Sequence, residues 1–321
     1  MNAIEIKGLK KVFKSRIHKN WIKNIFKPEY NSVEVVKNIS FTVQKGESVA
    51  FLGPNGAGKT TTTKMMTGLI YPTSGEVSVL GFTPNERKKD FLMRIGLVMG
   101  NKSGLNWDLT AMQTFQLYRE IYKINSDKFK SRVEELTKLL DVEKHLDKPV
   151  RKLSLGERMK LELIGAILHD PEILFLDEPT IGLDIIAKQN IRQFLRKIQK
   201  ESGITLILTS HDMDDIEEVC DRVLVINQGN LVYDDSINLL KSNYDKDRYV
   251  KFIFDKEIAL DEFTQYGDIY ESNKYEVVYK VIPSEMPKMI LAITQRYNVI
   301  DIDIHSTPLE EMIKEIFEGN S

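Results

Sequence analysis

The sequence of 321 residues contains little cysteine, little net charge and no long hydrophobic run. Its one cysteine, Cys220, excludes an intrachain disulfide framework and a zinc site built from thiolates. The 45 Lys and Arg residues nearly balance the 47 Asp and Glu residues, and a net charge of −2 argues against a basic surface for nucleic acid. No run approaches the roughly 18 apolar residues of a membrane-spanning helix. We therefore expect no nucleic-acid partner and no transmembrane segment.

The sequence also lacks the marks of secretion and of a long linker. Its first residues, Met1–Lys11, do not show the charged-then-apolar order of a signal peptide. There is no long Pro/Gly/Ser-rich stretch and no internal duplication. What remains is an ordinary globular composition, 42% hydrophobic and 29% charged, at about two domains' length. These features predict a soluble cytoplasmic protein that acts on a membrane only through a separate membrane partner.

The balance of charge changes along the chain. Residues 241–321 contain 10 Lys and Arg against 16 Asp and Glu, whereas residues 1–240 contain 35 against 31. This change in net charge, from +4 in residues 1–240 to −6 in residues 241–321, predicts a domain boundary near residue 240.

A basic segment near the N-terminus, Lys7–Lys27, has eight Lys and Arg residues and no acidic one. Within it, four apolar residues recur at helical spacing between lysines: Trp21, Ile22, Ile25 and Phe26. We therefore expect an insertion over about residues 14–30. It could be a basic amphipathic helix that contacts a membrane surface, or a solvated segment whose apolar residues pack on the domain.

Strand-like and helical segments alternate through residues 1–240. The expected strands are Ala3–Lys7, Phe41–Val43, Ser48–Leu52, Gly75–Val79, Ile95–Met99, Ile173–Leu176, Thr205–Thr209, Val223–Ile226 and Leu231–Tyr233. The expected helices are Lys59–Thr67, Met112–Tyr122, Lys128–Leu140, Gly156–His169, Ile185–Glu201 and Met213–Val219. Apolar strands alternating with helices favour an α/β fold with a central, mostly parallel sheet. Helical patterns are densest over about residues 105–170, which predicts a helical insertion.

After residue 240 the pattern restarts. The expected strands there are Tyr249–Phe254, Tyr275–Val281 and Val299–Ile304, and the expected helices are Glu285–Tyr297 and Leu309–Phe317. We interpret residues 241–321 as a small α+β domain that contributes no catalytic group.

The strongest local motif lies between an expected strand and an expected helix. Its sequence from Gly53 to Thr60, GPNGAGKT, fills every position of the Walker A pattern. Small residues let successive backbone N–H groups turn toward a phosphate, and the helix start adds a partial positive charge. Lys59 would reach the β- and γ-phosphates, and the Thr60 hydroxyl would bind Mg²⁺. The candidate nucleotide-binding residues are Gly53, Asn55, Gly56, Ala57, Gly58, Lys59, Thr60 and Thr61.

Two acids follow the buried strand Ile173–Leu176. Ligands bind at the carboxyl edge of an open α/β sheet, so Asp177 and Glu178 should lie beside the phosphate loop. Asp177 is then a candidate Mg²⁺ ligand, and Glu178 is a candidate general base that polarises the attacking water.

A histidine follows another apolar strand at the same expected edge. His211 comes directly after Thr205–Ser210 and could reach a γ-phosphate from there. The other histidines fall outside any motif, and we expect them to be structural or exposed: His18, His145, His169 and His305.

Two further motifs complete an ordered set. Leu153–Arg158, with the sequence LSLGER, opens a helix before the acidic strand, and Ile181–Asp184, with the sequence IGLD, follows the acids. Over about residues 1–235, this set resembles the ATP-binding subunit of ABC transporters. The resemblance implies a P-loop ABC-type ATPase fold with ATP and Mg²⁺ as cofactors, and catalysis by Lys59, Glu178 and His211.

The resemblance also implies a head-to-tail dimer, with the chain itself or with a sibling ATPase. In that family the signature loop, here Leu153–Arg158, caps the γ-phosphate held by the opposite subunit. Ser154 and Gly156 would then contact the partner's ATP, Asp184 would lie in the loop that links the two sites, and His211 would sense the γ-phosphate.

The sequence departs from the family pattern at three positions. Leu155 replaces a glycine of the signature, as in a subgroup coupled to ABC-2-type permeases, and Glu157 replaces a glutamine. A carboxylate beside phosphates should repel them, so we expect Glu157 to point elsewhere. The family places a glutamine that touches Mg²⁺ or water, and that faces the permease, after the strand matching Ile95–Met99. Asn101 is the nearest equivalent here, with a shorter amide.

The family stacks an aromatic ring on adenine, and two residues compete for that position. Counting forward from the first strand favours Phe13, whereas counting back from residues 35–41 favours Tyr30. The basic segment separates them, and either ring offers the π-face that stacking needs.

Taken together, the motifs predict an ATPase subunit that drives export through a separate ABC-2-type permease, bound peripherally to the inner face of the cell membrane. Residues 241–321 resemble the small accessory domain of drug- and polysaccharide-type relatives. The alternative is a soluble ABC ATPase that acts on nucleic acid or ribosomes without a permease, although this chain has neither duplicated ATPase units nor a long coiled coil. A non-hydrolysing regulatory subunit is a third reading, which Lys59, Glu178 and His211 oppose.

Overall fold

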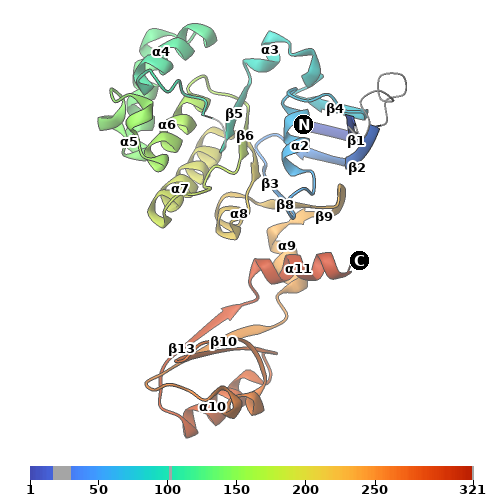
Figure 1. Cartoon of the computed structure of the whole chain (residues 1–321). Helices are drawn as coiled ribbons and strands as arrows, with labels where there is room; N and C mark the ends of the chain where they lie inside the picture. Colours follow the sequence, from blue (N-terminus) through green and yellow to red (C-terminus); the bar gives the residue numbers. More distant parts are fainter. Residues whose placement is uncertain (17–29, 101–102, 320–321) are drawn as a thin grey trace. The chain divides into compact units, whose positions relative to one another are not determined.

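The computed structural model describes residues 1–16, 30–100 and 103–319, and these fall into two compact units, Met1–Asp235 and Ser236–Ser321 (Figure 1). Nothing in the described part of the chain forms a helix with the length and apolar character that a bilayer crossing requires. Each unit has its own sheet and its own hydrophobic core.

A six-stranded sheet forms the centre of the first unit. In spatial order its strands are β5 (Ile95–Met99), β6 (Ile173–Asp177), β7 (Thr205–Thr209), β3 (Ser48–Leu52), β8 (Arg222–Asn227) and β9 (Asn230–Ser236). The strands from β5 to β8 run parallel. Every residue of β3, β6 and β7 is buried, as their continuous apolar sequences predict for strands covered on both faces. This arrangement confirms the α/β class.

Seven helices are described in the first unit: α2 (Lys59–Met66), α3 (Lys89–Leu92), α4 (Ala111–Tyr122), α5 (Ser126–Leu140), α6 (Leu155–Ile167), α7 (Ile185–Ser202) and α8 (Met213–Val219). Helices α4, α5 and α6 occupy the chain between β5 and β6 and lie together at one end of this unit (Figure 1). They make up the expected helical insertion. The short helix α3 was not expected, because four residues carry too little periodicity to be recognised.

A second, antiparallel sheet covers part of this unit in the order β2 (Tyr30–Gln44), β1 (Asn2–Arg16), β4 (Ser74–Val79). Both long strands extend well beyond the expected Ala3–Lys7 and Phe41–Val43, so those expectations were too short. The register pairs Arg16 with Tyr30, and the exposed basic outer half of this hairpin has no apolar alternation to reveal it. The expected helical part of the basic insertion lies outside the described residues.

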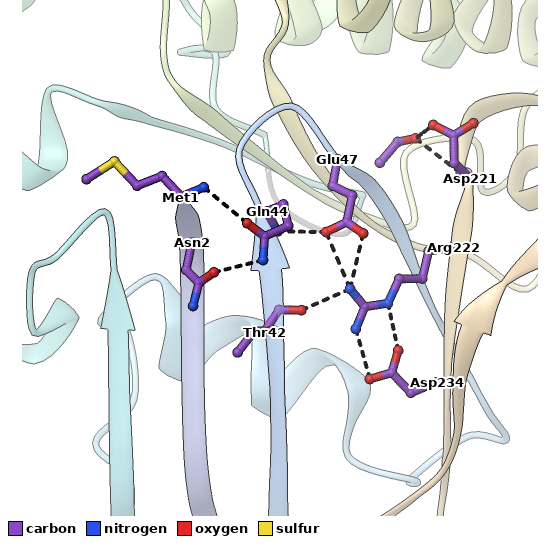
Figure 2. Close-up of polar contacts among 9 residues, drawn as sticks. Met1, Asn2, Thr42, Gln44, Glu47, Asp221, Arg222 and Asp234 are labelled. Carbon is purple, nitrogen blue, oxygen red and sulfur yellow. Dashed lines mark hydrogen bonds and ion pairs between the residues drawn. The ribbon is translucent and has the colours of Figure 1, made fainter.

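The two sheets of the first unit are joined by charged side chains at the end of the strands away from the phosphate loop (Figure 2). Arg222, at the start of β8, donates to both carboxylate oxygens of Asp234 at 2.7 and 2.9 Å. It also donates to Glu47 at 3.1 Å and to the carbonyl of Thr42 in β2 at 3.0 Å. A planar guanidinium suits such multiple contacts, which fasten β2, β8 and β9 together.

The second unit contains an antiparallel sheet in the order β11 (Asp268–Ser272), β12 (Glu276–Val281), β10 (Arg248–Phe254), β13 (Val299–Ser306). Its helices are α9 (Ile237–Tyr244), α10 (Met286–Arg296) and α11 (Leu309–Gly319). The core lies between the sheet and α10 and includes Val250, Phe252, Phe254, Phe263, Val277, Tyr279, Met289 and Ile293. The α+β character matches the prediction, although α9 and β11 were not expected.

Candidate active site

The phosphate loop, Gly53–Thr60, runs from the end of β3 into the first turn of α2. Its glycines are required by close packing as well as by conformation. Gly53 has φ +148°, and a Cβ there would lie 2.0 Å from the carbonyl oxygen of Ile226. Gly58 has φ +112°, and a Cβ there would lie 2.8 Å from the carbonyl oxygen of Val35. No other residue allows the loop to curl this tightly against its neighbours.

Lys59, the first residue of α2, turns its side chain back over this loop. Its Nζ donates to the carbonyl oxygen of Gly53 at 2.6 Å and to that of Pro54 at 3.3 Å. Burial lowers the pKa of Lys59, while the nearby charges of Glu178 and Asp177 oppose that shift. The ammonium group is therefore held at the mouth of the loop, where a phosphate chain would be enclosed.

Asp177 joins the ends of β6, β7 and α2. Its Oδ1 accepts a hydrogen bond from the hydroxyl of Thr60 at 3.0 Å and another from Thr209 at 2.7 Å. Asp177 is buried, at 5% exposure. A carboxylate and a hydroxyl oxygen at this separation are the hard oxygen donors that Mg²⁺ binds together with substrate phosphates. Of the three residues predicted as metal ligands, Thr60 and Asp177 thus lie together and suit that ion, and the third, Asn101, lies outside the described residues.

Glu178 turns out of the sheet directly after β6, with φ +56°. Its N–H donates to the carbonyl oxygen of Thr209 at 2.9 Å, and its Oε1 lies 3.2 Å from Nε2 of His211. Burial raises the pKa of Glu178 to about 7, against the opposing charge of Lys59. Burial and the charge of Lys59 lower the pKa of His211. A carboxyl group with a pKa near neutrality is well matched to accepting a proton from water.

These groups line one cleft of about 380 Å³. Its walls are Val35, Asn55, Gly56, Ala57, Gly58, Lys59, Thr60, Thr61, Asp177, Glu178, Ile181 and His211. The cleft therefore unites the phosphate loop with both acids and the histidine, which the sequence could place only at the same edge of a sheet.

Other predicted site residues lie elsewhere. Ser154, Gly156 and Asp184 do not line this cleft and instead lie at the starts of α6 and α7. Phe13 lies in β1, is 41% exposed, and has the Nζ of Lys11 5.0 Å from its ring centroid. It does not line the cleft either.

Two predicted contacts cannot be placed. Asn101 lies outside the described residues, and of Tyr30 only the backbone in β2 is described.

The start of α6 shows where the carboxylate of Glu157 points. The Ser154 hydroxyl accepts from the Glu157 N–H at 3.2 Å, and Glu157 Oε2 accepts from the Ser154 N–H at 2.9 Å. This is a capping box, which satisfies two otherwise unpaired N–H groups. The other oxygen, Oε1, lies 3.2 Å from Nε2 of His145. The glutamate thus folds back onto its own helix end.

A buried acid that the sequence did not single out links the two catalytic loops. Asp215 in α8 is 1% exposed and accepts hydrogen bonds from Thr180 and, at 2.7 Å, from Ser210. Burial raises the pKa of Asp215. Thr180 comes two residues after Glu178, and Ser210 directly precedes His211. No motif marks Asp215, because its role depends on contacts between separate loops.

A family model described as ABC transporter matches residues 36–181. The chain is 34% identical over 223 residues to the ABC transporter ATP-binding protein NatA of Bacillus subtilis, covering 70% of this chain and 89% of that protein. It is 32% identical to the bacitracin transport ATP-binding protein BcrA of Bacillus licheniformis, covering 91% and 95%. It is 36% identical to the Nod factor export ATP-binding protein I of Burkholderia lata, covering 62% and 64%.

Solved structures share the fold. The structure of cbiO1 from Clostridium perfringens, part of the ABC transporter complex cbiONQ, matches with a TM-score of 0.62 and 25% identity, covering 75% of this chain and 91% of that one. The dimeric structure of MJ0796, a bacterial ABC transporter cassette, matches with a TM-score of 0.62 at 24% identity, covering 73% and 98%. At 24% identity, the match to MJ0796 shows that the fold is shared and nothing further.

Proposed function

The chain belongs to the ABC transporter ATP-binding proteins and is an ATP hydrolase, and from that premise we propose that it drives export through a separate ABC-2-type permease. The observation that carries the proposal is the single cleft that holds Lys59, Thr60, Asp177, Glu178 and His211 together. A relative named for bacitracin transport supports a transport role, and one named for Nod factor export supports the direction.

In the proposed mechanism the loop N–H groups and Lys59 bind the β- and γ-phosphates of ATP. Glu178 accepts a proton from the attacking water, and the neighbouring His211 contacts the γ-phosphate. Thr60 and Asp177 would hold Mg²⁺, with Asn101 as a further candidate. When bound, that ion would neutralise charge on the phosphates.

We propose that a second ATP-binding chain completes the site. Ser154 and Gly156 lie at the start of α6, outside the chain's own cleft, so their proposed ligand is the ATP of the partner. The dimer is head-to-tail, formed with the chain itself or with a sibling ATPase, and Asp184 lies between its two sites. ATP favours the closed dimer because it contacts both chains, and hydrolysis removes that preference.

We propose the permease contact at a groove of about 550 Å³ beside β5 and between α4 and α6. Met99 and Ser103 line it, and in the sequence they flank Asn101, the position that the family resemblance turns toward the permease. Tyr118, Ile121 and Tyr122 supply an apolar wall from α4. The chain would then lie in the cytoplasm, peripherally on the inner face of the membrane.

In this proposal residues 1–240 carry the ATPase and residues 241–321 form a small accessory domain. The test of the whole proposal is mild-detergent affinity purification of the tagged full chain from native membranes, followed by mass spectrometry. Recovery of a polytopic membrane protein is the expected result. Recovery with ribosomes or nucleic acid alone would replace the proposal with the soluble alternative.

A further inference from the structure

The signature loop of this chain, Leu153–Arg158, contains a negative charge where phosphate is proposed to bind. Glu157 is the third residue of α6, and a carboxylate there offsets the positive potential of the helix start. The hydrogen bond from the Ser154 N–H is the main cause that lowers the pKa of Glu157, so the side chain is ionised. For a phosphate to bind at this loop, another group must therefore offset the charge of Glu157 or hold its carboxylate away from the phosphate.

His145 meets that carboxylate from a separate part of the helical insertion. It ends the short 3-10 helix η2 (Glu143–His145) and is 5% exposed, and its Nε2 lies 3.2 Å from Glu157 Oε1. The opposite ring nitrogen, Nδ1, lies 3.3 Å from Nζ of Lys148. An ammonium group can only donate, so Nδ1 of the neutral ring accepts, and the hydrogen is on Nε2, the nitrogen that contacts Glu157.

His145 thus lies between Lys148, which hydrogen-bonds to its Nδ1, and Glu157, whose Oε1 is 3.2 Å from its Nε2. Burial lowers the pKa of His145, and Lys148 and Lys144 act in the same direction against Glu157 and Asp141. The ring is therefore neutral, with its tautomer set by Lys148. The positive charge of Lys148 also lowers the pKa of Glu157.

We propose that His145 is the positioning residue of the signature loop, because it holds Glu157 in the capping box and away from the phosphate of the partner's ATP. With Oε2 on the Ser154 N–H and Oε1 on His145, both carboxylate oxygens are engaged. The Ser154 hydroxyl accepts from the Glu157 N–H, which leaves its own hydrogen free to donate to a phosphate. The N–H groups of Leu155 and Gly156 have no acceptor within the helix and point the same way.

This assignment explains a departure from the family pattern. A glutamine at position 157 could form the capping box without adding a charge, and would need no histidine. A glutamate can serve at this position only if its charge is held and compensated. The contact with His145 holds it, and the nearby charge of Lys148 compensates it. His145 lies twelve residues before Glu157 in the sequence, so no local motif joins them.

The inference rests on the proposed dimer, and its test is ATP turnover by the purified full chain together with whatever subunits accompany it. His145→Leu removes the N–H donor at similar volume and should lower kcat by about tenfold or more. His145→Gln keeps a donor and should retain more activity than the leucine variant. Adding Glu157→Gln to His145→Leu should restore most of the lost turnover, because the charge that needed a partner is gone.

A matched pair of lysines provides the control. Lys148→Gln should lower kcat by about threefold or more, because the ring loses the group that sets its tautomer. Lys144→Gln, on the same turn, should leave kcat close to that of the wild type. The affinity of each variant for a fluorescent ATP analogue, measured without turnover, reports whether the phosphate loop is intact and the protein folded. This affinity should change little in any of the variants.

Two results would overturn the inference. One is wild-type turnover by His145→Leu. The other is a loss of turnover that Glu157→Gln does not reverse in protein that still binds the analogue. If His145→Leu does not fold, equal turnover by Lys148→Gln and Lys144→Gln would have the same meaning. Failure of the proposed dimer looks different, because Glu178→Gln protein would then not associate with a second ATP-binding chain when ATP is added.

Discussion

At the scale of single residues, the glycines of the phosphate loop differ in what they tolerate. Gly53→Ala would place a methyl group 2.0 Å from the Ile226 carbonyl oxygen, whereas at Gly56 no described atom lies within 4 Å of the added carbon. Both have positive φ, so both substitutions carry backbone strain. We expect Gly53→Ala to destabilise the fold by about 3 kcal/mol or more, and Gly56→Ala by about 1–2 kcal/mol.

Chemical denaturation of the two alanine variants without nucleotide measures this difference directly. Equal stability losses would show that the close contact at Gly53 relaxes easily. The same contact would then not explain why the loop needs glycine there.

The residues of the phosphate loop could be predicted from sequence because they are contiguous and their chemistry fixes their spacing. Asp177, Glu178 and His211 could be predicted because parallel strands end at one edge. His145 and Asp215 could not, since their partners lie on other elements and nothing local marks them. The adenine-stacking residue stays a prediction with two candidates, because neither ring is shown in the cleft.

At the scale of elements, Asp215 couples α8 to the loops after β6 and β7. Asp215→Ala would leave the hydroxyls of Thr180 and Ser210 without their buried acceptor and would remove the only buried carboxylate among those that the structure places near Arg192, whose Nε lies 3.7 Å from it. We expect a loss of about 2–4 kcal/mol in unfolding free energy, together with a lower kcat because Glu178 and His211 move.

The exposed neighbour provides the control for this variant. Asp214 is 76% exposed at its side chain and pairs with Arg192 at 3.1 Å, so Asp214→Ala should cost much less. Urea denaturation compares the two. A similar loss for both variants would mean that the charge of Arg192, rather than the buried hydrogen bonds, dominates.

Most elements of the first unit could be predicted because their periodicity is strong. Strand β3 begins and ends at the expected residues, and α4, α6 and α7 lie within two residues of the expected ranges. The lengths of β1 and β2 were underestimated. The outer half of this hairpin is held by pairing between the two strands, and it has no buried side that would show as an apolar pattern in the sequence. Helix α9 begins within two residues of the start of the second unit, close to the boundary expected near residue 240, but the helix itself was not expected.

At the scale of the whole molecule, the proposed function requires a membrane partner. Ile121 lines the proposed permease groove and is 51% exposed, although it makes up part of an apolar surface. Ile121→Asp should leave ATP binding intact and reduce co-purification of the membrane protein by about tenfold, since a charge cannot be buried there without a partner. Leu291→Asp, which changes a residue 57% exposed in α10, is the control and should retain the partner.

Immunoblotting of the detergent extract for the membrane protein measures this effect. If the membrane protein co-purifies fully with the Ile121→Asp variant, the permease contact lies on another surface. The sequence alone could not locate the groove proposed for this contact, because it is assembled from β5, α4 and α6, which are far apart in the chain.

The measurement that tests the central claim most directly is the Mg²⁺-dependent ATPase rate of the detergent-purified complex with wild-type chain and with Glu178→Gln. The account predicts that the variant retains ATP and the membrane partner but loses turnover by about a hundredfold or more, because Glu178 is the group proposed to accept the proton from water. Glu201→Gln, at the exposed end of α7, should match the wild type. A Glu178→Gln complex that hydrolyses ATP at close to the wild-type rate would contradict the account.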